Sequence, residues 1–219
     1  MLAFLAALAI IERDWPLVLM WLLAALAVDG VDGSLARWAK VKERAPRIDG
    51  ATLDLIIDYL NYVFIPALLI VRAELVPSSL APSLAAAILI SSLYNFTRTD
   101  LKTADNYFRG FPALWNVVAF YLFAAGVSPE AAAIAVVLLA ALTFAPVHFV
   151  HPFRVRDYGR WLPLLACGWA AATVALLWPG WTGDARTALL AFSLAAGAAL
   201  IGLGLLRTLR GPRSPAESR

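Results

Sequence analysis

Four aspartates form two closely spaced pairs within one stretch of the chain. Asp29 and Asp32 are three residues apart, and Asp54 and Asp58 are four apart. Residues three or four apart share one face of a helix, so each pair presents two carboxylates on the same side. Hard divalent cations such as Mg²⁺ and Mn²⁺ prefer oxygen ligands of this kind. If the two helices are neighbours, the four aspartates predict a site for two metal ions about 3.5–4 Å apart, which suits phosphoryl-type transfer.

The residues around these aspartates have the character of a phosphate-binding site. Gly33, Ala36 and Gly50 are small where a bulky ligand or a helix must approach the backbone. Arg37 can bind a diphosphate through two parallel hydrogen bonds. The aspartate spacing alone leaves open a polar network between helices or an ion pathway in a transporter. The four accompanying residues favour the metal-assisted transfer site. The whole segment reads Asp29-x2-Asp32-Gly33-x2-Ala36-Arg37, twelve residues, then Gly50-x3-Asp54-x3-Asp58.

The composition shows what kind of protein must position these residues. Of 219 residues, 62% are hydrophobic and only 15% are charged, with a mean hydropathy of +0.76. Soluble domains have roughly 45–50% apolar and about 25% charged residues, so a soluble enzyme, a disordered chain and a fibrous repeat are excluded. The single cysteine, Cys167, excludes a disulfide framework and a cysteine-ligated zinc site, and we expect it to be inert. The net charge of +3 is too small and dispersed for nucleic-acid binding.

Apolar segments separated by prolines and polar residues predict an all-α polytopic membrane bundle of about eight transmembrane helices in one domain, residues 1–219. The first segment spans only about 16 Å, so we expect its helix to lack the N-terminal half, without a cleaved signal peptide. We expect residues 211–219 to form a disordered tail. The predicted segments are Met1–Ile11, Trp15–Val28, Leu53–Val71, Leu80–Phe96, Phe111–Val127, Ala131–Val150, Trp161–Trp178 and Ala188–Leu206.

The distribution of basic residues predicts the orientation in the membrane. If residues 29–47 lie in the cytoplasm and the segments alternate, 15 of the 18 Lys and Arg residues fall on the cytoplasmic side. This positive-inside bias predicts cytoplasmic termini and a site that faces the cytoplasm. Four basic residues of the first cytoplasmic loop are interpreted as membrane anchors, with binding of donor phosphates or anionic lipid as the alternative. They are Lys40, Lys42, Arg44 and Arg47.

The aspartate segment resembles the signature of the CDP-alcohol phosphotransferases, D-x2-D-G-x2-A-R…G-x3-D-x3-D, with all eight positions present. The resemblance implies a membrane enzyme that transfers a substituted phosphate from a CDP-linked donor to an alcohol and releases CMP. It also implies a six-helix core and a homodimer. It assigns two divalent cations, Mg²⁺ or Mn²⁺, to Asp29, Asp32, Asp54 and Asp58, with Asp58 as the catalytic base as well. It assigns contacts with the CDP donor to Asp32, Gly33, Ala36, Arg37 and Gly50.

A narrower resemblance covers nearly the whole chain and is to the bacterial phosphatidylcholine synthases. It implies condensation of CDP-diacylglycerol with choline in the inner membrane of a bacterium. Members of that family usually carry more sequence before and within the first helix. The matching segments are Asp58-Tyr59, Tyr62-Val63, Pro66-Ala67, Lys102-Thr103-x2-Asn106-Tyr107-Phe108-x-Gly110-Phe111-Pro112, Trp115-Asn116 and His148-Phe149-x-His151-Pro152-x-Arg154-Val155.

Two further groups of residues are open to more than one interpretation. His148 and His151 are spaced like zinc ligands, but no third ligand is evident. The favoured interpretation is interfacial hydrogen bonding and the end of a helix before Pro152. The resemblance adds that His151 and Arg154 line the cytoplasmic mouth of the site. Asp49, beside the motif, is predicted to be a helix N-cap or a loop residue.

A choline acceptor would be recognised by aromatic faces, because its quaternary ammonium cannot donate an N–H hydrogen bond. Glycerol phosphate, inositol or serine as the acceptor would instead favour Arg or Lys in the pocket, and the segment Leu53–Val71 contains neither. A carboxylate-site transporter would predict inverted repeats, whereas the motif occurs once. Each candidate aromatic residue also has packing as its simpler interpretation. The candidates for choline binding are Tyr59, Tyr62, Tyr94, Tyr107 and Trp115.

Overall fold

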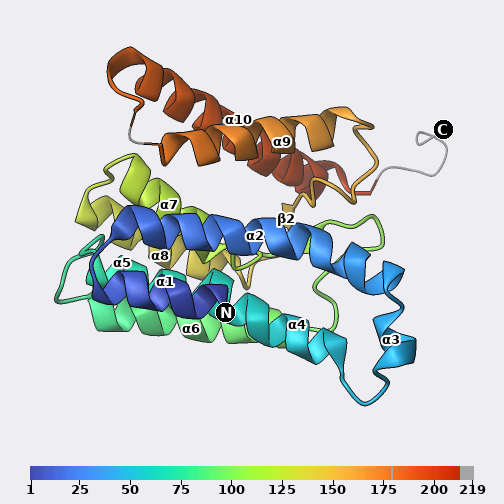
Figure 1. The fold of residues 1–219 in the computed structure, drawn as a ribbon. Coiled ribbons are helices and arrows are strands. Elements are labelled where there is room, and N and C mark those ends of the chain that lie inside the picture. Colours follow the sequence, from blue (N-terminus) through green and yellow to red (C-terminus); the bar gives the residue numbers. More distant parts are fainter. Residues whose placement is uncertain (179, 213–219) are drawn as a thin grey trace. The chain divides into compact units, whose positions relative to one another are not determined.

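The computed structural model describes residues 1–178 and 180–212, and most of them are helical (Figure 1). Of the predicted disordered tail, residues 213–219 lie outside the described residues. The helices are α1 (Leu2–Ile11), α2 (Trp15–Trp38), α3 (Val41–Arg44), α4 (Gly50–Tyr59), the π-helical turn η1 (Leu60–Phe64), α5 (Ile65–Arg72), α6 (Ala81–Thr97), α7 (Trp115–Ala124), α8 (Pro129–Leu142), α9 (Trp161–Leu176) and α10 (Gly183–Arg210). Two short strands are β1 (Phe108–Arg109) and β2 (His148–Phe149).

The chain forms two compact units, which are described separately. The first comprises residues 1–92 and 114–133, and the second comprises residues 93–113 and 134–219. In the first unit α2 packs against α1 and α7, and α5 packs against α7. Its core includes the fully buried Trp115, whose indole N–H donates to Ser92 Oγ at 2.9 Å. A buried polar indole is thereby satisfied, as a packed membrane core requires.

Helix α2 is longer than the apolar segment that predicts it. The segment ends at Val28, but the helix continues to Trp38 and carries Asp29 and Asp32 with it. Val28, at the end of the predicted segment, and Val31 and Leu35 of the extension are each more than half exposed. Their spacing keeps them on one helical face, which suits contact with lipid. Lys40, in a left-handed conformation with φ of 51°, follows the end of α2.

The second long helix, α4–η1–α5, begins at an Asp49 N-cap, one of the two roles predicted for this residue, and so starts three residues before the predicted Leu53. The Asp49 carboxylate accepts hydrogen bonds from the backbone N–H groups of Ala51 and Thr52 at 3.1 and 3.3 Å. The helix widens into a π-helical turn at η1, directly after α4. There the Ile57 carbonyl accepts from the Asn61 side-chain amide at 2.9 Å as well as from the Leu60 backbone N–H.

Among the described residues, three helical runs are long and apolar enough to cross a membrane by length and composition: Trp15–Trp38, Gly50–Arg72 and Gly183–Arg210. Further apolar helices of 10–17 residues are α1, α6, α7, α8 and α9. The chain is therefore an integral membrane protein with a mostly helical fold, as its composition predicts.

The second unit contains a small antiparallel sheet that the all-α prediction did not include. Phe108 pairs with Phe149, and Arg109 pairs with His148. Helix α8 accordingly ends at Leu142 rather than at the predicted Val150. The error arises because the apolar run continues through Phe149, although Pro146 within it disfavours helix and the helix ends just before that proline.

A cluster of apolar and polar contacts holds the second unit together. Buried Tyr107, Val155 and Leu162 pack with neighbouring apolar side chains of this unit. The Tyr107 hydroxyl donates to Asp157 Oδ2 at 3.0 Å. Burial and, to a smaller extent, this hydrogen bond raise the pKa of Tyr107. In α10, a Cβ at Gly204 would collide with the His148 carbonyl, so glycine allows α10 to approach β2 closely.

Gly110 provides a test of how tightly the second unit is packed. Its φ is +79°, and a Cβ there would collide with the Thr143 carbonyl. We expect Gly110→Ala to lower the free energy of unfolding by roughly 2–5 kcal/mol, combining a left-handed backbone with displacement of packed atoms. Unfolding of the detergent-solubilised chain measures the effect. The matched control is Gly159→Ala, since Gly159 has φ of +55° and a Cβ built there would meet no atom within 4 Å. We expect only about 1–2 kcal/mol there, and equal losses in the two variants would contradict the packing argument.

Candidate functional site

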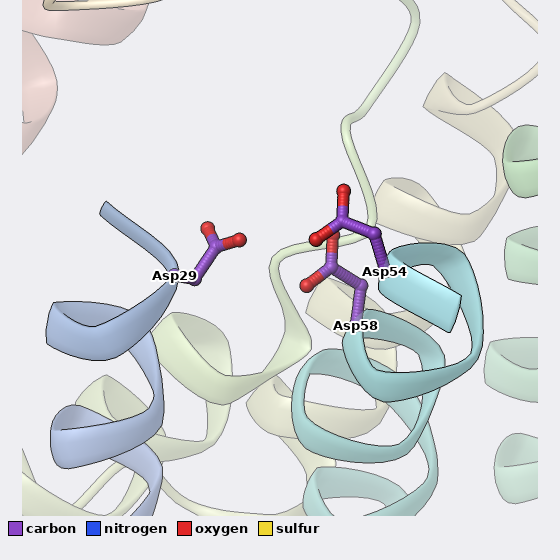
Figure 2. A group of neighbouring side chains, drawn as sticks. All are labelled: Asp29, Asp54 and Asp58. Atoms are coloured by element: carbon purple, nitrogen blue, oxygen red, sulfur yellow. The ribbon is translucent and has the colours of Figure 1, made fainter. Parts of the chain in front are cut away.

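Three of the predicted metal-binding aspartates come together in the first unit. Asp29 projects from α2, and Asp54 and Asp58 project from successive turns of α4, with their carboxylates directed toward one another (Figure 2). One oxygen of each carboxylate lies within 4.8 Å of the others. Asp29 and Asp58 are partly buried, whereas Asp54 is exposed. The convergence predicted from the two helical spacings is therefore present for these three residues, which we call the carboxylate cluster.

The cluster depends on two helix segments with few packing contacts of their own. Asp49 sets where α4 begins, and its Oδ2 also accepts a hydrogen bond from the Thr52 hydroxyl at 2.6 Å. From that fixed start, Asp54 and Asp58 fall four residues apart on one face. No residue of α4 is buried in the described structure. The cluster therefore lies where the helices are open to a ligand rather than in the packed core.

The chemistry of the cluster fits a divalent cation. Three carboxylates at this separation repel one another, and a bound cation relieves the repulsion while keeping all three ionised. Their hard oxygen ligands and partial exposure suit Mg²⁺ or Mn²⁺, which retain some water ligands when bound. The residues present thus fit the predicted metal.

Asp32 does not belong to the group of three that the structure brings within 4.8 Å. It is partly buried and lies one helical turn beyond Asp29. Nearby, Arg37 Nη2 donates to Ser34 Oγ at 2.9 Å, and a Cβ at Gly33 would lie 3.5 Å from Arg37 Nη1. The predicted donor-binding arginine is thus folded back along its own helix.

The other predicted donor-binding positions lie at exposed ends of helices. Gly50 is the first residue of α4, with no atom within 4 Å of a Cβ built there. Ala36 lies in the exposed last turns of α2. These two positions and Gly33 leave the backbone near the cluster accessible to a ligand.

Tyr62 is the candidate aromatic residue that the structure brings to the cluster. It lies in η1, four residues after Asp58, and is 6% exposed. Its hydroxyl lies beside Asp29 and within the electrostatic influence of Asp58 and Asp32. This oxygen is buried and, among the described residues, has no partner in hydrogen-bonding geometry.

The other candidate aromatic residues have different surroundings. Tyr59 is partly buried, and its hydroxyl donates to the Leu89 carbonyl at 3.1 Å. Trp115 is fully buried in the core of the first unit. Tyr94 and Tyr107 belong to the second unit, where Tyr94 packs against Phe144 with ring centroids 4.8 Å apart. A role in choline binding for these four residues stays a prediction.

The two histidines lie in the second unit near basic side chains. The His151 ring stacks on Phe108 with ring centroids 5.4 Å apart. Burial, followed by the charges of Lys102 and Arg154, lowers the pKa of His151 to about 4. Burial also lowers the pKa of His148, whose Nδ1 lies 3.2 Å from Thr208 Oγ1. Both rings are therefore neutral at pH 7. The Thr208 contact confirms that His148 forms hydrogen bonds, but the expected end of a helix before Pro152 is wrong, because α8 ends at Leu142 and His148 lies in β2.

One polar arrangement in the second unit was missed from the sequence. Arg207 Nε donates to Asp105 Oδ2 at 2.7 Å, and its guanidinium lies 5.6 Å from the centroid of the Tyr107 ring. Partial burial opposes ionisation of Asp105, but hydrogen bonds from Arg207 and Thr103 outweigh it and lower the pKa of Asp105. The only available signal was the position of Asp105 within the Lys102–Pro112 motif. A cleft of about 480 Å³ here is lined by Thr103, Ala104, Asp105, Arg109, His148, Arg207 and Pro212.

Known proteins similar to this chain include three named phosphatidylcholine synthases. The protein from Pseudomonas aeruginosa is 48% identical over 157 residues, 72% of this chain and 66% of the relative. The protein from Bradyrhizobium diazoefficiens is 41% identical over 174 residues, 79% of this chain and 65% of the relative. The protein from Legionella bozemanae is 40% identical over 150 residues, 68% of this chain and 69% of the relative. The chain thus spans just under two thirds of the length of the first two relatives. No family model matches the chain.

Metal binding tests the carboxylate cluster without any substrate. We expect the detergent-solubilised chain to bind Mn²⁺, and Asp29→Asn, Asp54→Asn and Asp58→Asn each to weaken that binding at least about tenfold, because each removes a charged oxygen ligand. Electron paramagnetic resonance of free Mn²⁺ measures the affinity. Glu74→Gln, at an exposed acid of the same unit outside the cluster, is the matched control. Equal affinity in the wild type and all three Asn variants would contradict a metal site here.

The environment of His151 predicts a loss of stability in mild acid. The pKa of His151 is lowered from 6.5 to about 4 in the folded chain, so the unfolded state binds the proton more readily. Stability from this residue is present above pH 6.5 and is lost as the pH falls from 6.5 toward 4. We expect His151→Gln, which stays neutral, to reduce the loss of thermal stability between pH 6.5 and 5. An unchanged slope in the variant would show that this ring does not titrate as described.

Proposed function

The chain belongs to the phosphatidylcholine synthase family, and on that premise we propose that it transfers the phosphatidyl group of CDP-diacylglycerol to choline. The products are phosphatidylcholine and CMP. The carboxylate cluster of Asp29, Asp54 and Asp58 is the single observation that carries the proposal, because it unites the two halves of the eight-residue motif. The extent and identity of the match with relatives that carry this name support it further.

The proposed roles of the acidic residues follow from their placement. Asp29, Asp32, Asp54 and Asp58 hold two divalent cations, Mg²⁺ or Mn²⁺, of which Asp32 is the ligand outside the group of three. When bound, these ions supply positive charge that offsets the negative charge of the diphosphate and of the departing CMP. Asp58 also accepts the proton of the choline hydroxyl as its oxygen attacks the phosphorus that bears diacylglycerol. The bond from that phosphorus to the CMP oxygen then breaks.

The proposed donor site uses the small residues and the arginine of the motif. Gly33, Ala36 and Gly50 leave room for CDP beside the backbone, and Asp32 contacts the donor as well. Arg37 swings from Ser34 to the diphosphate, where two parallel hydrogen bonds are stronger than its single bond to a neutral hydroxyl. His151 and Arg154 line the cytoplasmic mouth.

The proposed membrane arrangement extends the three long apolar runs. We propose that the five shorter apolar helices cross as well, giving about eight crossings around a six-helix core, with residues 1–219 acting as one catalytic domain. The distribution of Lys and Arg supports a site on the cytoplasmic face of a bacterial inner membrane. We further propose a homodimer, as the family resemblance implies.

Choline is the proposed acceptor because the site offers carboxylates and aromatic rings rather than basic side chains. The run Gly50–Arg72 has its one basic residue at its last position, far along the helix from Asp58. Glycerol phosphate would need buried cations beside Asp58 to neutralise its phosphate. Tyr59, Tyr62, Tyr94, Tyr107 and Trp115 remain the proposed source of aromatic contacts to the ammonium.

An acceptor competition tests this function. The purified chain, supplied with CDP-diacylglycerol, Mn²⁺ and equal concentrations of choline, serine, inositol and glycerol phosphate, should form phosphatidylcholine in preference to the other lipids. Chromatography of the labelled lipids measures the products. A chelator should abolish transfer and added Mg²⁺ or Mn²⁺ should restore it. Preference for another acceptor would overturn choline and leave the enzyme class standing, whereas full activity after exhaustive chelation would overturn the metal mechanism.

A further inference from the structure

The hydroxyl of Tyr62 has no role in the transfer described above, yet the fold directs it at the carboxylate cluster. The side chain is 94% buried, its hydroxyl lies beside Asp29, and that hydroxyl has no hydrogen-bond partner among the described residues. We propose that the Tyr62 hydroxyl is a positioning group for Asp29, donating a hydrogen bond to that carboxylate when it binds a divalent cation. The proposal rests on the proposed metal centre and adds to it a residue outside the aspartate motif.

The energetics of burial favour a partner for this hydroxyl in the working state. A buried hydroxyl without a hydrogen bond costs roughly 1–3 kcal/mol. A phenol can donate one hydrogen bond, and an ionised carboxylate can only accept, so Tyr62 and Asp29 are complementary. The carboxylates that influence the hydroxyl are, in decreasing order, those of Asp29, Asp58 and Asp32. Asp29 is therefore the acceptor that requires the smallest movement.

A carboxylate that binds a metal ion commonly also accepts a hydrogen bond from a neighbouring group. One carboxylate oxygen binds the ion, and a bond to the other oxygen fixes the orientation of the group; losing such a bond typically weakens metal binding 10–100-fold. Asp29 is the cluster member contributed by α2, whereas Asp54 and Asp58 share α4. A contact from η1 to Asp29 would link the two helices at the metal centre and hold the single carboxylate of α2 in place.

The local backbone supports a positional role for Tyr62. It lies within η1, the π-helical turn that directly follows α4, and such turns are frequent at functional sites. Its neighbours Asn61 and Val63 are also buried, and the Asn61 side chain is held by its bond to the Ile57 carbonyl. Tyr62 itself is 6% exposed, so its ring is also covered. The hydroxyl is the part of Tyr62 available to the cluster, which favours a hydrogen-bonding role over contact between the ring face and an ammonium.

Tyr62→Phe tests the proposal, because it removes the hydroxyl and keeps the ring. We expect Mn²⁺ binding to the full-length, detergent-solubilised chain, measured by electron paramagnetic resonance without substrate, to weaken about 10–100-fold. Thermal stability without metal should stay equal or rise, since the lost hydroxyl had no partner. The matched control is Tyr121→Phe, a tyrosine of the same unit whose ring packs against Phe120, and we expect its Mn²⁺ affinity to stay within twofold of the wild type.

Kinetics separate this role from a choline-binding role. With Tyr62→Phe, the Mn²⁺ concentration for half-maximal transfer should rise while the KM for choline at saturating metal stays unchanged. Wild-type Mn²⁺ affinity in Tyr62→Phe, or a rise only in the KM for choline, would overturn the proposal. Failure of the proposed function has a different result: the wild type would bind Mn²⁺ and respond to Tyr62→Phe, but would form no phosphatidylcholine.

Discussion

Repulsion between carboxylates is the constraint around which the first unit is organised. Asp29, Asp54 and Asp58 bring one oxygen each within 4.8 Å of the others, an arrangement that α2 and α4 must hold against the repulsion between the carboxylates. Helix α2 is anchored by its buried apolar residues in the half before Asp29, and the run after Asp58 is anchored through η1 and α5. The acidic segments themselves are mostly exposed. The energy that holds the cluster therefore comes from apolar packing deeper in the same two helices.

The site was predictable from local properties of the chain, namely helical spacing and ligand chemistry, together with the expectation that the two helices are neighbours. The structure agrees on the convergence of three aspartates and on the cap. Helix α2 continues ten residues past Val28, whereas the apolar run ends there because Asp29, Gly30, Asp32 and Gly33 interrupt it. The π-helical turn was not predicted either. Its signal is the set of hydrogen bonds in the folded helix, which residue types alone do not encode.

Long-range pairs account for the rest of what the sequence did not reveal. Arg207 and Asp105 are 102 residues apart, and β1 and β2 are separated by α7 and α8. Nothing local in two-residue strands exceeds the apolar signal of the helices beside them. Likewise, the Tyr62 ring was a reasonable candidate for ammonium binding from its type and position. That Tyr62 is buried with its hydroxyl beside Asp29, which favours a role for the hydroxyl over the ring, could be seen only in the folded structure.

The π-helical turn has a consequence for the long helix that contains it. A regular α-helix advances about 100° per residue, so the direction of its residues at one end fixes the direction of those at the other. A π-helical turn contains more residues than an α-helical turn. It therefore rotates the side chains after the turn relative to those before it. Upstream of η1, α4 has no buried residue and can direct two aspartates toward α2; downstream, α5 buries Ile65, Leu69 and Ile70 in the core. Helix α4 and helix α5 can therefore face different neighbours. The acidic face of α4 and the apolar face of α5 need not lie along one continuous stripe of the helix.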